Sequence, residues 1–170
     1  ANGAVRVDAD TLEFGRRQFY TETFGNEVFL TGVLGLLGGP LAYAAVARAL
    51  ADVGGKGTTN LRVELAADAT VGGRFFPRGA VIDTGIDVPK GSTTPLGIRV
   101  RKRLGKVRVG ITCAACHSTV DPATFRVVHG APNADFNLGL LLALATNSAS
   151  FFPHADRADL AAAGTDPVAT

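Results

Sequence analysis

Hydrophobic and polar positions divide the chain into three parts, and the first part, residues 1–57, predicts helices. A helix is expected over residues 11–37, with a break near Gly25. Residues 38–40 read Gly-Gly-Pro and predict a turn, because two glycines and a proline do not continue a helix. A second helix is expected over residues 41–52, where alanine supplies high helix propensity.

The second part, residues 58–112, changes to short apolar and polar alternations that predict strands. Residues 61–65 alternate as a half-buried strand does, and residues 80–82 predict another short strand. Residues 71–74 form a turn into Phe75 and Phe76. Two further runs, 98–101 and 106–109, flank Leu104-Gly105 and predict a β-hairpin. One face of this hairpin is apolar, whereas the other carries arginine and lysine.

The third part, residues 113–170, predicts a small strand over residues 125–129 and an apolar helix over residues 138–145. Asp135 or Asn137 is available as the N-cap of that helix. The three parts together predict a single α+β domain over residues 1–170, with helices around a cofactor and β-hairpins in the long preceding segment.

A membrane span is the alternative interpretation of residues 28–47, which are 20 consecutive uncharged residues. Gly-Gly-Pro lies within this run, and much of it is glycine and alanine rather than leucine or isoleucine. Two short buried helices that meet at a turn explain the run better, so no transmembrane span is expected.

Composition supports one globular domain. The chain has 170 residues, of which 46% are hydrophobic and 19% charged, and this excludes a disordered tail. Its formal charge of +2 argues against a nucleic-acid partner. Methionine and tryptophan are absent, and there are only two cysteines. Because the chain opens at Ala1 rather than methionine, we expect either that a leader has been removed or that an N-terminal segment has been left out.

The two cysteines belong to the sequence Cys113-Ala-Ala-Cys116-His117, the C-x-x-C-H attachment motif of c-type haem. This spacing lets two thiols reach two vinyl groups on one porphyrin edge, with His117 beneath the iron. A structural zinc site needs four ligands, and a thioredoxin-like pair needs a βαβ setting, so both alternatives are weaker. The sequence therefore predicts one covalent haem c, and with it export to the periplasm or beyond the cell.

Because methionine is missing, this chain cannot supply the methionine of the usual histidine–methionine ligation of the iron. His154 is the favoured second axial ligand, because Phe151 and Phe152 beside it can pack on a porphyrin. His129, a water, an open face, a lysine or tyrosine, or a ligand from another chain remain alternatives. Bis-histidine ligation closes the iron and leaves electron transfer, whereas an open face permits peroxide or oxygen chemistry.

Six of the 17 positive residues lie between Arg99 and Arg108, directly before the motif. A solvated strand face is the simplest explanation. The functional alternative is that these charges neutralise haem propionates or bind an acidic redox partner.

Residues 111–121 (ITCAACHSTVD) and 130–139 (GAPNADFNLG) resemble a group of exported bacterial c-type cytochromes. Residues 22–27 (ETFGNE) are similar to the N-terminal segment of that group. The resemblance implies a place in the broad cytochrome c superfamily, with looser similarity to di-haem peroxidases and rubber-oxygenase-type proteins. It carries over Cys113, Cys116 and His117, but the second C-x-x-C-H of di-haem peroxidases is missing from these 170 residues.

The function expected from the sequence is one-electron transfer by an exported mono-haem cytochrome, with redox proteins or other cytochrome subunits as partners. A peroxidase-like or oxygenase-like haem enzyme is one alternative. A subunit that passes electrons between stacked haems in a larger assembly is another.

Overall fold

The N-terminal helices form close to where the sequence predicts them. The computed structural model describes residues 7–103 and 105–148. Helix α1 spans Ala9–Thr21. Asp8 is its N-cap, and the Asp8 carboxylate accepts a hydrogen bond from the backbone N–H of Thr11 at 2.7 Å. Helix α2 spans Asn26–Val28 and continues as the π-helical turn η1, Phe29–Val33. Helix α3 follows at Tyr43–Val53.

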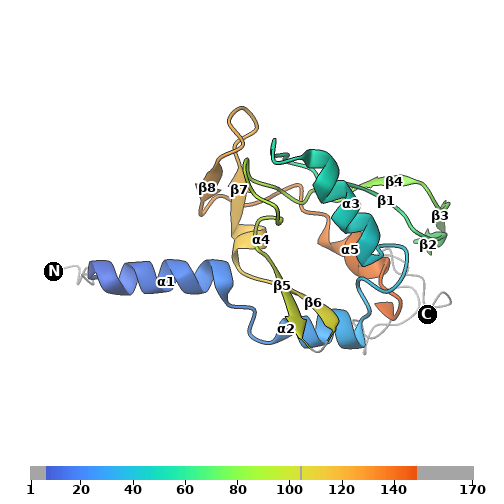
Figure 1. Ribbon diagram of the computed structural model, residues 1–170, viewed down its shortest axis with the longest axis horizontal. Coiled ribbons are helices and arrows are strands. Elements are labelled where there is room, and N and C mark those ends of the chain that lie inside the picture. Colours follow the sequence, from blue (N-terminus) through green and yellow to red (C-terminus); the bar gives the residue numbers. More distant parts are fainter. Residues whose placement is uncertain (1–6, 104, 149–170) are drawn as a thin grey trace.

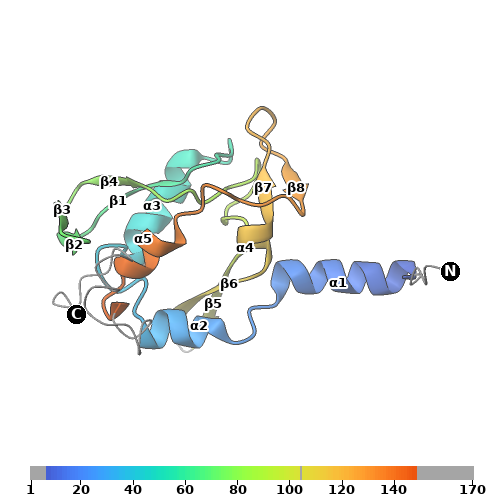
Figure 2. The ribbon, with the colours of Figure 1, turned by 180° about the vertical axis from the view of Figure 1, so that it is seen from behind.

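The predicted break near Gly25 is confirmed. Phe24 and Gly25 both have positive φ angles, 51° and 78°, which end the helical path between α1 and α2. Helix α1 extends away from the other elements in both views (Figures 1 and 2), and none of its residues is buried. The helix thus contacts the remainder chiefly through its C-terminal end.

The strands form four two-stranded antiparallel sheets within the described residues. The pairs are β1 (Arg62–Glu64) with β4 (Val81–Asp83), β2 (Ala69–Val71) with β3 (Arg74–Phe76), β5 (Ile98–Arg103) with β6 (Lys106–Ile111), and β7 (Ser118–Val120) with β8 (Val127–His129). Helices and small antiparallel sheets confirm the α+β class.

The β5–β6 hairpin has the two faces that the sequence predicts. Ile98 pairs with Ile111 and Val100 with Val109 on one face, whereas Arg101 opposes Arg108 on the other. The alternation follows from the two-residue period of a strand.

The main core lies among α3, the β1–β4 pair, η1 and α5 (Leu138–Ala143). Its most deeply buried side chains are those of Leu34, Leu61, Leu65 and Leu144, together with Val63 and Val88. Asn137 caps α5 by accepting from the Leu140 N–H at 3.2 Å, which decides between the two caps considered. Among the residues described, no helix combines the length and hydropathy needed to cross a membrane.

Candidate functional site

The C-x-x-C-H motif forms a one-turn helix, α4 (Ala114–His117), with Cys113 at its N-cap in helical conformation. At about 100° per residue, positions 113, 116 and 117 fall within about 100° of arc, opposite positions 114 and 115. The exposures agree with this division. Ala114 and Ala115 are buried, Cys113 and His117 are exposed, and Cys116 is half-buried. One side of the helix therefore carries both thiols and the imidazole.

The alanine side of α4 packs on the backbone of Gly97. A Cβ added at Gly97 would lie 2.0 Å from the backbone nitrogen of Ala115 and 2.4 Å from its Cα. The φ of Gly97 is 71°, a conformation that favours glycine. Both the backbone N–H and the hydroxyl of Thr112 donate to the Gly97 carbonyl, at 2.9 and 3.2 Å. These contacts fix the start of α4 against the loop before β5.

The two thiols are free and close enough to influence each other. Burial raises the pKa of the Cys116 thiol, and the nearby Cys113 raises it further. Cysteines of redox pairs and zinc sites are typically more acidic than a free thiol, not less. The motif does follow a strand, but β6 pairs antiparallel with β5, which is not a βαβ setting. Both properties disfavour thiol–disulfide chemistry.

A zinc site also lacks ligands in the part of the chain that the structure describes. No group of three or more His, Cys, Asp and Glu side chains there could hold a metal ion. Structural zinc requires four such ligands, so the two thiols and His117 do not suffice.

The end of α1 and the start of α2 contact the chain on the two sides of α4. The hydroxyls of Tyr20 and Ser118 lie 2.9 Å apart, immediately after the motif. Before the motif, the Asn26 side chain donates to the Ile111 carbonyl at 2.7 Å and accepts from its N–H at 3.0 Å. Phe24 lies between these two anchors and is 82% exposed. Its side chain is therefore almost fully exposed to solvent.

The chain continues from the motif into β7, and a buried carboxylate accepts two hydrogen bonds from this strand. Asp87 is 2% exposed and accepts from the Thr119 hydroxyl at 2.7 Å and the Val120 N–H at 2.8 Å. Burial raises the pKa of Asp87, Asp135 adds to the rise, and the two hydrogen bonds oppose it. Sequence reasoning missed Asp87, because its partners lie more than 30 residues away.

A second acidic residue that the sequence did not reveal lies on the basic face of the hairpin. Glu27 accepts a hydrogen bond from the Thr23 hydroxyl and lies 3.4 Å from the Arg101 guanidinium. The Thr23 hydrogen bond is the main cause of the lowered pKa of Glu27, and Arg101 and Arg108 lower it further. The basic face is consequently partly neutralised by α2 and is not a uniformly solvated surface.

The three histidines differ in how the structure places them. His117 is exposed, and its imidazole has no hydrogen-bond partner among the residues described. The Nδ1 atom of His129 contacts the Tyr20 hydroxyl, and the two rings meet edge to face with centroids 5.5 Å apart. His129 thus has a structural partner already. His154, the expected second axial ligand, lies outside the described residues.

The motif residues fit covalent haem attachment. Two free thiols and an imidazole unpartnered within the described residues lie on one side of a short helix, and the opposite side of that helix packs on Gly97. Asn133 adds a further restraint, because its backbone N–H donates to the Cys116 carbonyl at 2.9 Å. Comparison of the chain with protein-family models, curated proteins and solved structures found no match.

Proposed function

We propose that the chain is an exported mono-haem c-type cytochrome that carries single electrons. Cys113 and Cys116 would hold the haem through thioethers, and His117 would bind the iron. The observation that carries this proposal is the common exposed side of α4, on which all three side chains lie. When bound, the haem supplies reversible one-electron exchange at iron.

The surrounding residues keep these three side chains in place. Gly97 and Thr112 fix the start of α4, Asn133 binds the carbonyl of Cys116, and Asp87 holds the strand that follows. A site that must not reorganise during electron exchange benefits from such supports on rigid elements.

We further propose that His154 completes bis-histidine ligation and closes the iron to substrates. His129 is the weaker candidate for this ligand, because its Nδ1 atom already contacts Tyr20. Arg99 and Lys106, exposed on the basic face of the hairpin, would then contact an acidic redox partner.

In the first experiment, the chain is expressed together with a cytochrome c maturation system, and acidified acetone is used to extract any haem that is not covalently bound. Covalent haem stays with the wild-type protein and gives the pyridine haemochrome spectrum of two thioethers. Cys113→Ala and Cys116→Ala each shift that spectrum to the form with one thioether. Complete extraction of haem from the matured wild type would disprove the proposal.

The second experiment tests the axial ligand with a matched pair of variants. His154→Ala converts a low-spin ferric spectrum to high spin and allows carbon monoxide to bind the ferrous form, whereas His129→Ala leaves both unchanged. A high-spin wild type would instead favour the peroxidase-like alternative. Native mass spectrometry separates a free carrier from a subunit of a larger assembly.

A further inference from the structure

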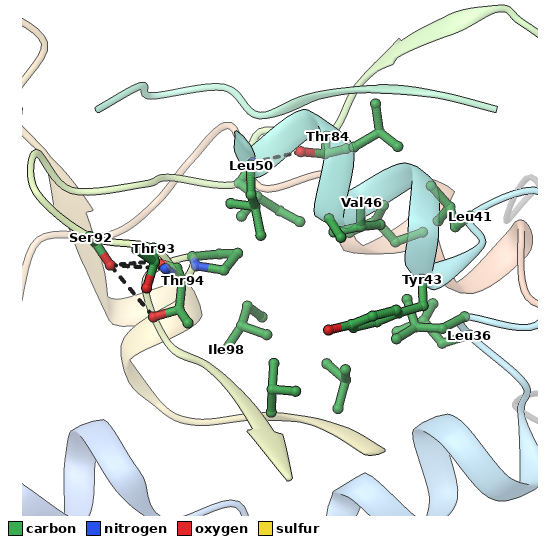
Figure 3. Close-up of a pocket in the computed structure, with 18 of the residues that line it drawn as sticks. Leu36, Leu41, Tyr43, Val46, Leu50, Thr84, Ser92, Thr93, Thr94 and Ile98 are labelled. Carbon is green, nitrogen blue, oxygen red and sulfur yellow. Dashed lines mark hydrogen bonds between the residues drawn. The ribbon is translucent and has the colours of Figure 1, made fainter. Parts of the chain in front are cut away.

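A large cavity lies beside the motif but is not lined by its residues. It has a volume of about 530 Å³, is partly open to solvent, and is bounded by α3, the apolar face of the β5–β6 hairpin, the loop before β5 and the start of α5 (Figure 3). Its walls are mainly aliphatic. They include Leu36, Leu41, Val46, Leu50, Ile98 and Val109. Small-molecule sites typically range from about 300 to 1,000 Å³, so this volume suits a ligand of that size.

Of the residues that the structure describes, those lining the cavity include no charged side chain. Transfer of a charged group from water into such surroundings is costly unless a partner charge is present. A carboxylate, phosphate or ammonium ligand is therefore disfavoured, and the occupant must be uncharged and largely apolar.

Two hydroxyl groups without a partner among the described residues mark opposite sides of the cavity. The Tyr43 hydroxyl points into the cavity from α3, and Thr93 lies across from it in the loop before β5 (Figure 3). The neighbouring hydroxyls are engaged: Thr84 donates to the Leu61 carbonyl at 2.6 Å, and Ser92 donates to the Thr94 carbonyl at 2.7 Å. A ligand with acceptor oxygens at two opposite ends would match the two available donors.

The cavity and α4 share one wall. Pro95 and Ile98 line the cavity, and Gly97 between them touches the backbone of Ala115. Ile111, which also lines the cavity, is separated from Cys113 by one residue. A ligand in the cavity would consequently lie one chain segment away from the helix that carries the proposed haem.

We propose that this cavity binds a quinone, an uncharged ring with two opposed carbonyl oxygens and an apolar tail. The hydroxyls of Tyr43 and Thr93 would donate to the carbonyl oxygens, and the aliphatic walls would hold the tail. The choice of a redox-active ligand rests on the proposed function, whereas the size, neutrality and donor positions rest on the cavity itself.

The test titrates the haem-loaded protein with a benzoquinone carrying one isoprenyl unit and measures heat by isothermal titration calorimetry. One-to-one saturable binding is expected. Ala47→Phe fills the cavity and weakens binding at least tenfold, whereas Ala44→Phe, an exposed position on the same helix outside the cavity, leaves it unchanged. Tyr43→Phe removes one donor and weakens binding roughly 2- to 12-fold, and it keeps the test decisive if Ala47→Phe fails to fold.

Several outcomes would overturn the quinone site. They are absent binding, binding unaffected by both Ala47→Phe and Tyr43→Phe, and tighter binding of laurate, whose carboxylate the cavity should reject. If Ala47→Phe prevents haem incorporation while Ala44→Phe does not, the cavity holds the haem itself, and the quinone site is wrong while the cytochrome proposal stands. Failure of covalent haem attachment overturns the proposed function, but quinone binding to the chain is then still measured separately.

Discussion

Gly97→Ala is expected to loosen the helix that carries the C-x-x-C-H motif. The new Cβ would lie 2.0 Å from the nitrogen and 2.4 Å from the Cα of Ala115, so it overlaps backbone that cannot rotate away. Alanine at a φ of 71° also costs about 1–2 kcal/mol, and overpacking typically adds about 1–3 kcal/mol. The free energy of unfolding should therefore fall by about 2–5 kcal/mol.

Gly91→Ala is the matched control for this substitution. Gly91 has a φ of 79°, close to that of Gly97, but nothing lies within 4 Å of an added Cβ. Its variant should lose only the conformational part, about 1–2 kcal/mol. Urea denaturation followed by circular dichroism measures both variants, and pyridine haemochrome per mole of protein measures haem loading. Equal destabilisation of the two variants, with equal haem loading, would refute the packing argument.

Two further predictions concern buried or shielded carboxylates and the pH dependence of unfolding. The raised pKa of Asp87 means that the folded state holds its proton more firmly, so stability falls as pH rises from the ordinary carboxyl pKa through the raised one. Asp87→Asn should abolish this fall, and an unchanged pH profile in urea melts would contradict it. The lowered pKa of Glu27 gives stability that is present above the ordinary glutamate pKa and lost as acid protonates the folded carboxylate. Glu27→Gln should flatten this acid-side loss, with Glu13→Gln at an exposed position as the control.

Elements with strong local signals were predictable from the sequence. The helix expected over residues 41–52 forms at Tyr43–Val53, and the one expected over residues 138–145 forms at Leu138–Ala143. The β5–β6 hairpin is confirmed because its turn and alternation lie within one short segment. Helix propensity, turn residues and strand alternation depend on residues a few positions apart, so they can be recognised in the sequence itself.

Contacts between distant segments were not predictable. Strand β7 pairs with β8 although residues 118–120 showed no separate strand signal, and β1 pairs with β4 across an intervening hairpin. The support that Asp87 gives to β7 depends on partners more than 30 residues away. The role of Gly97 likewise depends on the position of Ala115, which only the folded chain defines. The motif residues were thus identifiable, whereas the residues that position them were not.

Because α4 and the cavity share one wall, a substitution in that wall should affect both haem loading and quinone affinity. A substitution on the far side of the cavity should affect quinone affinity alone. Gly97→Ala pushes against Ala115 on one side and shifts Pro95 and Ile98 on the other, so it should lower both haem loading and quinone affinity. Ala47→Phe acts from α3, across the cavity, and should lower only quinone affinity. The loss of quinone binding free energy in the double variant should differ from the sum of the two single losses, because both substitutions change the same cavity. If Gly97→Ala lowers haem loading and leaves quinone affinity intact, the loop before β5 does not transmit the displacement, and the helix and the cavity are independent features of the fold.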